Sequence, residues 1–398
     1  MAIDNKDKKV LKSSIEREQN EVACSAECEK IKGSKNLNVP HLRFPEFQEE
    51  WKKCKLGDLC NVLMCKRILA SQTNTEDGVP FYKIGTIGST PDAYISKELF
   101  DDYKVKYSYP HKGEVMITCA GTVGKCVVYD GEDAYFQDSN IVWIDNPTQN
   151  ISNGFLFHLL SKVDWRKLNS TTIIRIYNDD LRNLKMSYPQ KEEQQKISHL
   201  LSLLDERITT QNKIIDKLQS LIRGIAQNIA RNNQPNVLLS ECLECSSSTL
   251  QESDICENGT YPVYGANGIV GYFDDYSTED EAVYIIKDGS GVGTVSYVTG
   301  KCSATGTLNT LQAKDGYLLQ YLYYMLKVFN FEPYKTGMAI PHIYFKDYGK
   351  AKIFCPSYTE QLKYVELLSA IDNKLSVEQR ILTNLSLQKQ YLLRQMFI

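Results

Sequence analysis

The sequence predicts an α+β protein built as two strand-rich globular domains and two long helices, in the order globule, helix, globule, helix. A helical segment recurs at an offset of 167 residues, and each copy continues into a heptad pattern. The stretches before the helices carry β-branched and aromatic residues between Gly, Asn and Asp, as strands and turns do. With 398 residues, 42% of them hydrophobic, the chain is long enough for two or three packed domains, which excludes a wholly disordered protein.

The internal repeat is clearest where the two predicted helices start. Residues 189–205 read PQKEEQQKISHLLSLLD, and residues 356–372 read PSYTEQLKYVELLSAID. A proline precedes each helix, where its missing N–H is tolerated, and Ser357 with Glu360 fits a capping box. The pattern predicts two helices that begin alike at equivalent places of a duplicated chain.

Each helix then carries an apolar stripe in which steps of four and three residues alternate, which predicts a coiled-coil seam. The seam includes Ile197, Leu201, Leu204, Ile208, Ile215 and Leu218 in the first copy, and Leu368, Ile371, Leu375, Leu382, Leu385 and Leu392 in the second. Gln211 and Glu378 interrupt the two stripes at equivalent places. Two interpretations stay open for them: a buried polar layer that fixes the register, or an exposed edge.

These patterns divide the chain into five segments: a polar lead-in expected to be flexible (1–38), a first globule (39–188), a first helical region (189–235), a second globule (236–355) and a second helical region (356–398). The repeat extends into the globules, where GTVGK at 121–125 aligns with SGVGT at 290–294 and IYNDDL at 176–181 aligns with IYFKDY at 343–348. The same alignment matches Asn140 with Asn309.

The net charge and the cysteine content exclude some classes of protein. Lys and Arg number 46 against 49 Asp and Glu, and this net charge of −3 excludes a polycation that coats nucleic acid. The 12 cysteines, without a secretory signal or an apolar run of membrane length, predict reduced thiols, a cytoplasmic protein and no membrane partner. The pairs Cys24/Cys28 and Cys242/Cys245 are spaced as zinc ligands, but no matching second pair follows, so ordinary thiols are the favoured interpretation.

Three features resemble the specificity (S) subunit of Type I restriction–modification enzymes. They are the opening VPHLRFPEFQEEW followed by KLGDL, the repeated pattern of proline, Glu-Gln and LLSxxD, and the twofold order of globule and helix. The resemblance covers residues 39–398. It implies two β-rich target-recognition domains (39–188 and 236–355) that each read half of a bipartite, asymmetric DNA target. The helices between them would form an antiparallel coiled coil, with a pseudo-twofold internal repeat.

The resemblance also implies partners and cofactors. The S subunit of this family is not an enzyme and binds no cofactor or metal of its own. Its coiled coil docks two methyltransferase (M) subunits, which use S-adenosylmethionine, and two restriction (R) subunits that use ATP and Mg²⁺ can join them. The expected partner of the globules is double-stranded DNA.

The candidate DNA contacts are polar side chains in loops, because base edges and phosphates are read by hydrogen-bond donors and acceptors. In the first globule they are Lys83, Thr86, Ser89, Thr122, Lys125, Gln137, Asn140, Arg175, Tyr177 and Asn178. In the second they are Asn267, Lys287, Ser290, Thr294, Thr307, Asn309, Lys335, His342, Tyr344 and Lys346.

Two other functions compete with this interpretation. A self-contained methyltransferase or nuclease is disfavoured because GSGVG (289–293), GTVGK and DNPT (145–148) each fall short of the cofactor or substrate motif that they approach. A non-DNA scaffold, with two β-rich modules on a coiled coil, explains the near-neutral charge but not the paired motifs. If the chain reads DNA, its charge predicts that partner subunits supply most phosphate contacts.

Overall fold

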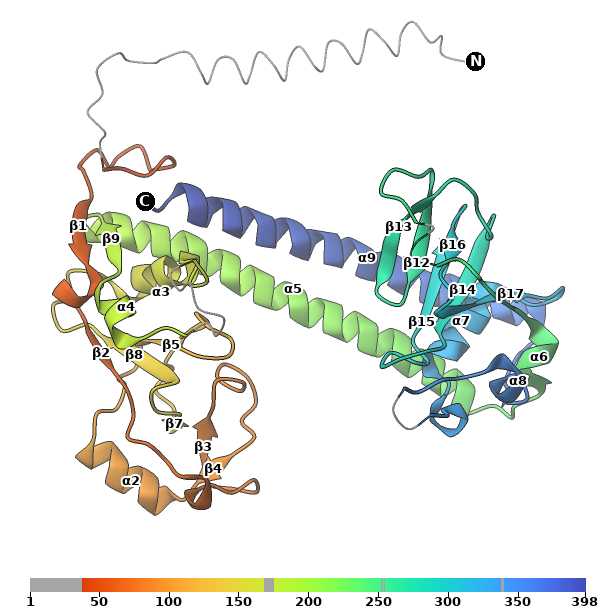
Figure 1. Ribbon diagram of the computed structural model, residues 1–398, viewed down its shortest axis with the longest axis horizontal. Helices are drawn as coiled ribbons and strands as arrows, with labels where there is room; N and C mark the ends of the chain where they lie inside the picture. Colours follow the sequence, from red (N-terminus) through yellow and green to blue (C-terminus); the bar gives the residue numbers. More distant parts are fainter. Residues whose placement is uncertain (1–37, 168–174, 252, 254, 338–339) are drawn as a thin grey trace, which may run out of the picture. The chain divides into compact units, whose positions relative to one another are not determined.

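The computed structural model describes residues 38–167, 175–251, 253, 255–337 and 340–398 (Figure 1). Apart from Asn38, the predicted lead-in lies outside these residues, and so do Cys24 and Cys28. The chain divides into two compact units, Met1–Leu203 with Gln388–Ile398, and Leu204–Leu387. Both boundaries fall inside a long helix, and in the part of the chain described here no helix is long and apolar enough to cross a membrane.

Unit 1 is built mainly from short strands, which form two sheets and one two-stranded ribbon. The strands are β1 (Lys52–Lys55), β2 (Asn61–Leu63), β3 (Val79–Tyr82), β4 (Tyr94–Ile95), β5 (Val115–Thr118), β6 (Cys126–Val128), β7 (Tyr135–Phe136), β8 (Ile141–Asp145) and β9 (Lys185–Tyr188). The short helices are α2 (Lys97–Lys106), α3 (Asn153–Lys162) and α4 (Asn178–Arg182). The sheet orders are β2-β8-β5-β6 and β4-β3-β7, and β1 pairs with β9.

Unit 2 repeats this topology. Its strands are β10 (Val237–Leu238), β11 (Leu243–Ser247), β12 (Tyr261–Gly265), β13 (Gly268–Phe273), β14 (Glu281–Ile286), β15 (Val295–Thr299), β16 (Ser303–Ala304), β17 (Leu308–Ala313) and β18 (Lys352–Ile353). Its short helices are α6 (Leu239–Cys242), α7 (Leu319–Val328) and α8 (Phe345–Tyr348). The orders β11-β17-β14-β15 and β13-β12-β16 and the pair β10-β18 match those of unit 1, including one parallel pair in each three-stranded sheet.

The cores of the two units are alike because the central strands are apolar along their length. All four residues of β5 are buried, and so are Ile141–Ile144 of β8 and Ala282–Ile286 of β14. Strands covered on both faces read as continuous hydrophobic runs. Helix α3 covers β5 and β6, and α7 covers β14 and β15.

The two long helices are α5 (Lys191–Arg231) and α9 (Tyr358–Gln395). The capping box predicted at the start of α9 is supported, because Glu360 Oε2 accepts from the backbone N of Ser357 at 3.3 Å, and it also accepts from Ser357 Oγ at 2.8 Å. A buried glutamine anchors each start. Gln194 accepts from Ser152 N at 2.7 Å in unit 1, and Gln361 accepts from Leu318 N at 2.9 Å in unit 2, which ties each helix to the loop before α3 or α7.

The helices pair antiparallel within Leu204–Leu387 (Figure 1). Gln211 of α5 bonds to Glu378 of α9, and further along α5 Ile222 lines one cavity with Leu375, so the partner numbers fall as the α5 numbers rise. The predicted seam residues are all buried or half-buried: Ile197, Leu201, Ile215, Leu368 and Leu375 are buried, and Leu204, Ile208, Leu218, Ile371, Leu382, Leu385 and Leu392 are half-buried. The predicted α+β class with an antiparallel coiled coil and an internal repeat is therefore confirmed.

The polar interruption of the seam is a buried layer. Gln211 and Glu378 are each 6% exposed. Gln211 Nε2 donates to the backbone oxygen of Glu378 at 3.1 Å and to its carboxylate. Lys374 Nζ pairs with the same carboxylate. Of the two interpretations of these positions, the exposed edge is wrong and the buried polar layer is confirmed, while its role in fixing the register stays a prediction.

One part of the sequence alignment between the globules is wrong. Strand pairing sets Thr118 opposite Ile141 in unit 1 and Ile286 opposite Leu308 in unit 2. The residue before each second strand is therefore Asn140 or Thr307, and Asn140 corresponds to Thr307 rather than to Asn309. The alignment failed because it carried one offset through loops whose lengths differ between the repeats.

Candidate nucleic-acid interface

Ten candidate residues of the first globule gather in one group of loops, called loop cluster 1 (83–89, 119–125, 137–140 and 175–178). These loops follow β3, join β5 to β6, join β7 to β8, and lead into α4. Hydrogen bonds connect them. Thr122 Oγ1 donates to Ile84 O at 3.1 Å, Ile84 N donates to Gln137 Oε1 at 3.3 Å, and Cys119 N donates to Asn140 O at 2.8 Å.

In unit 2 the equivalent group is loop cluster 2 (287–294, 305–309, 335–337 and 340–346). Gly289 N donates to Pro341 O at 3.0 Å, and Lys287 N donates to Thr307 O at 3.0 Å. It contains Lys287, Ser290, Thr294, Thr307, Asn309, Lys335, His342, Tyr344 and Lys346. Asn267 lies elsewhere, in the exposed turn between β12 and β13.

The two clusters have the same backbone framework. Cys119 O accepts from Ile176 N at 2.9 Å, and Lys287 O accepts from Ile343 N at 2.9 Å. Because these residues also donate to Asn140 O and Thr307 O, Cys119 and Lys287 are equivalent central positions. Burial raises the pKa of the Cys119 thiol to about 12, which favours the protonated thiol.

A glycine and an aromatic ring hold the middle loop of each cluster. Gly124 N donates to Thr118 O at 2.8 Å, and Gly293 N donates to Ile286 O at 2.9 Å, with φ of 84° and 89° respectively. A Cβ on Gly124 would lie 2.1 Å from Trp165 Cδ1, and one on Gly293 would lie 3.1 Å from Phe331 Cβ. Only glycine allows this backbone conformation and this approach without strain.

Loop cluster 1 presents cations and hydroxyls at its surface. Lys83 pairs with Asp92 at 3.0 Å, and Lys125 Nζ donates to Ile87 O. Arg175 Nη2 donates to Ser139 Oγ at 3.1 Å and lies over the ring of Tyr177, which is 62% exposed. Thr86 uses its hydroxyl within the turn that follows Lys83, while Ser89 is exposed and Asn178 is half-buried.

Loop cluster 2 has a different set of side chains on the same framework. Lys346 lies over the exposed ring of Tyr344, Lys335 pairs with Glu332, and His342 Nδ1 lies 2.6 Å from Asp288 Oδ1. Asp288 is not among the predicted contacts, although it directly precedes the glycine turn that contains Ser290. Thr294 and Ser290 are exposed, and Thr307 bonds to Thr305.

Asn309 does not lie at the surface of its cluster. It is 4% exposed, and its amide bonds to Ser247 Oγ at 3.1 Å and to Tyr348 OH at 3.3 Å. The reason is its place within β17 rather than before it, so its side chain points into the unit and stabilises the packing of α8.

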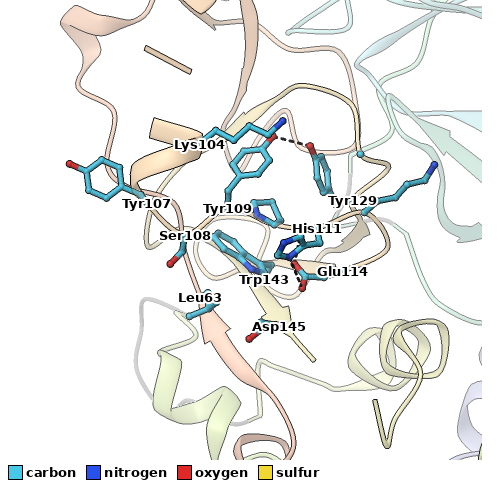
Figure 2. Close-up of a pocket in the computed structure, with 13 residues that line it drawn as sticks. Leu63, Lys104, Tyr107, Ser108, Tyr109, His111, Glu114, Tyr129, Trp143 and Asp145 are labelled. Atoms are coloured by element: carbon cyan, nitrogen blue, oxygen red, sulfur yellow. Dashed lines mark hydrogen bonds and ion pairs between the residues drawn. The ribbon is translucent and has the colours of Figure 1, made fainter. Parts of the chain in front are cut away.

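A separate pocket of about 630 Å³ opens at the other end of β5 (Figure 2). Figure 2 shows Tyr109 and Trp143 among the residues that line it and His111 beside Glu114. Nδ1 of His111 lies 3.6 Å from Oε1 of Glu114. Burial raises the pKa of Glu114. Because this pocket and loop cluster 1 lie at opposite ends of β5, the pocket is not part of the candidate interface.

Six of the described cysteines are buried: Cys60, Cys65, Cys119, Cys242, Cys302 and Cys355. Cys242 is buried, and its thiol donates to Leu239 O at 3.4 Å. Burial raises the pKa of Cys242 to about 12. Among the described residues, no group of three or more His, Cys, Asp or Glu side chains is arranged to hold a metal ion.

Relatives of this chain are specificity subunits. It is 50% identical over 167 residues to a Haemophilus influenzae protein assigned as a type I restriction enzyme specificity subunit, a match to 42% of this chain and 43% of that protein. It is 28% identical over 116 residues to the type I restriction enzyme EcoprrI specificity subunit of Escherichia coli, 29% of each chain. These matches span less than half the length of the curated relatives.

The fold also has a solved counterpart. The crystal structure of the type I restriction–modification system S subunit from M. genitalium is similar over 90% of this chain and 99% of that chain, with a TM-score of 0.63 and 18% sequence identity. The sequence model of the type I restriction modification DNA specificity domain matches residues 48–220 and 239–387, which include both loop clusters. The chain therefore belongs to the family of type I restriction–modification DNA specificity domains.

Proposed function

We propose that this chain is the sequence-specific DNA recognition subunit of a type I restriction–modification complex and that it reads a bipartite, asymmetric target. The observation that carries the proposal is the pair of loop clusters, which share a backbone framework but carry different side chains. A shared backbone framework suits two loop clusters that each approach a stretch of DNA duplex in the same way. Different donors and acceptors on that framework suit two different half-sites.

The residues exposed on the clusters suit both parts of DNA recognition. Lysines and arginine can hold phosphates, while hydroxyls, amides and the guanidinium group of Arg175 can read base edges in the major groove. The net charge of −3 provides little attraction for a polyanion overall. We infer that partner subunits supply most phosphate contacts and that this chain supplies selectivity.

The partners proposed are two methyltransferase subunits docked on the coiled coil, with two restriction subunits joining the full complex. In this proposal the chain is not an enzyme. S-adenosylmethionine, ATP and Mg²⁺ are used by the partner subunits, and the methyl group is transferred to adenine.

The test is to co-express the chain with a type I methyltransferase subunit, to measure whether the two co-purify, and to map methylated adenines across the host genome. The expected result is one motif with two specified parts and an unspecified spacer, whose halves are not inverted copies of each other. Absence of a stable complex, absence of methylation, or a continuous motif would contradict the proposal. The methyltransferase subunit expressed alone is the control.

A further inference from the structure

We propose that two equivalent residue pairs, Ala120 with Arg175 and Asp288 with His342, set the different base preferences of the two half-sites. Arg175 would select a guanine, and the Asp288–His342 pair would select a base that carries an amino group in the major groove. This inference rests on the proposed function in DNA recognition and names residues that determine its specificity.

The equivalence follows from backbone bonds. Cys119 O accepts from Ile176 N, and Lys287 O accepts from Ile343 N, both at 2.9 Å. The residue after each acceptor is Ala120 or Asp288, and the residue before each donor is Arg175 or His342. Each pair therefore occupies the same place in its cluster, where the middle loop meets the segment that leads into α4 or α8.

In loop cluster 2 the pair is held in one arrangement. His342 N donates to Thr336 O at 2.8 Å and Thr336 N donates to His342 O at 2.9 Å, which fixes the backbone of the histidine. His342 Nδ1 lies 2.6 Å from Asp288 Oδ1. An ionised carboxylate only accepts hydrogen bonds, so Nδ1 carries the proton of this bond, and the second carboxylate oxygen of Asp288 is left as an acceptor.

This arrangement makes the pair acceptor-rich. The side chains of His342 and Asp288 are 35% and 37% exposed, so a ligand can reach them. The carboxylate of Asp288 offers its oxygens as acceptors. Acceptors in the major groove pair with the N6 amino group of adenine or the N4 amino group of cytosine, and a guanine offers only acceptors there.

In loop cluster 1 the chemistry is reversed. Ala120 has no acidic group, and Arg175 is a donor that Ser139 orients, with Nη2 3.1 Å from Ser139 Oγ and 3.4 Å from Ser139 O. A guanidinium group has only donors, and its usual partners on DNA are the O6 and N7 acceptors of guanine. The same place in the two clusters thus carries opposite hydrogen-bonding character.

The experiment exchanges the pairs and maps the methylated motif in cells that also express the methyltransferase subunit. In the double variant Asp288→Ala/His342→Arg, one position in one half of the motif should change from adenine or cytosine to guanine, while the other half stays unchanged. The reverse variant, Ala120→Asp/Arg175→His, should change one guanine in the other half. Glu281→Gln is the matched control, because Glu281 pairs with Tyr297 at the opposite end of β14 and should leave the motif unchanged.

A milder variant keeps the test decisive if an exchange prevents folding. Asp288→Asn in the purified complex should reduce discrimination at the one affected position by roughly 5- to 100-fold, measured as methylation rates on duplexes that carry each base there. An unchanged motif and unchanged discrimination in correctly assembled complexes would overturn the inference, and so would changes in both halves. If the wild-type complex itself produces no bipartite motif, the proposed function fails instead.

Discussion

Gln211 of α5 donates a hydrogen bond to the backbone oxygen of Glu378 of α9 at 3.1 Å, and the two residues are 167 positions apart. That separation equals the offset of the internal repeat, so each residue contacts its own counterpart. In an antiparallel pair of equivalent helices, counterparts meet at only one level, and their neighbours on either side diverge. The bond therefore identifies the level about which the two copies of the helix are paired.

The first prediction concerns this polar layer. Gln211→Ala should destabilise the helix pair by about 1–2 kcal/mol, because it removes two buried hydrogen bonds and leaves a small cavity. Hydrogen–deuterium exchange of the amides in residues 204–231 and 358–387 measures the change. The double variant Gln211→Leu/Glu378→Leu should recover the protection, since apolar residues stabilise a seam while a polar layer fixes its register. Unchanged exchange in Gln211→Ala would contradict the role of the layer.

A second prediction is the pH dependence of the same pair. The ion pair with Lys374 and then the bond from Gln211 hold the pKa of Glu378 below its ordinary value of 4.5. A pKa lower in the folded state means that the carboxylate stabilises the folded chain above pH 4.5 and that this contribution is lost as the pH falls through the folded-state pKa. The thermal midpoints of the wild type and Glu378→Gln should therefore converge on acidification. A difference that grows in acid would show that another group dominates.

The third prediction concerns the framework of loop cluster 1. Gly124→Ala should destabilise unit 1 by roughly 2–4 kcal/mol, because strain at positive φ adds to the clash with Trp165. Gly113→Ala is the matched control, since Gly113 has a similar φ of 89° but no atom within 4 Å of the added Cβ. Gly113→Ala should destabilise unit 1 by only about 1 kcal/mol, the cost of placing alanine at a positive φ. Equal destabilisation in urea titrations of the two variants would exclude a role for the contact with Trp165.

The fourth prediction concerns affinity rather than selectivity. Lys287→Ala should weaken DNA binding by the complex and lower the slope of log K against log salt by about one, as the loss of one phosphate contact does. Lys301→Ala removes the same charge from the far end of β15, where Lys301 lies over Tyr276, and should leave the slope unchanged. Binding to labelled duplex at several salt concentrations gives both slopes. A lower slope in both variants would indicate a general charge effect.

The sequence predicted the helices and the repeat well because those signals are periodic. Heptad positions such as Leu201 and Leu375 depend on local spacing, and the capping box of Ser357 and Glu360 depends on two residues that are only three positions apart. Gln194 and Gln361 were visible as repeated letters. Their anchoring role was not, because their partners Ser152 and Leu318 are set by tertiary packing.

The contacts within the loops were harder to predict, because they too are set by tertiary packing. The segments of loop cluster 1 were identified as candidates, but the bonds that connect Ile84, Thr122 and Gln137 join residues up to 53 positions apart. Asn309 was misplaced because a shift of two positions moves a residue from a loop into a buried strand, and only strand pairing reveals the shift. Asp288 is identified as a candidate contact by its hydrogen bond with His342, and the two residues are 54 positions apart in the sequence.

The last prediction tests whether the helix pair sets the spacing of the proposed target. Because 211 faces 378 in an antiparallel pair, residues 204–210 face residues 379–385. Deleting both stretches removes one heptad from each helix and preserves the polar layer. The helices should shorten by about 10 Å, which corresponds to about 3 base pairs of duplex. The methylated motif should then have a shorter spacer between unchanged half-sites.

Single deletions are the controls for that experiment. Removing residues 204–210 alone leaves the facing stretch of α9 unmatched and shifts the seam, so helix pairing and methylation should both fail. The double deletion should restore pairing, as exchange protection in residues 191–203 and 386–395 would show. A double deletion that assembles with the methyltransferase subunits and still methylates the original motif would exclude the helices as the element that measures the spacer.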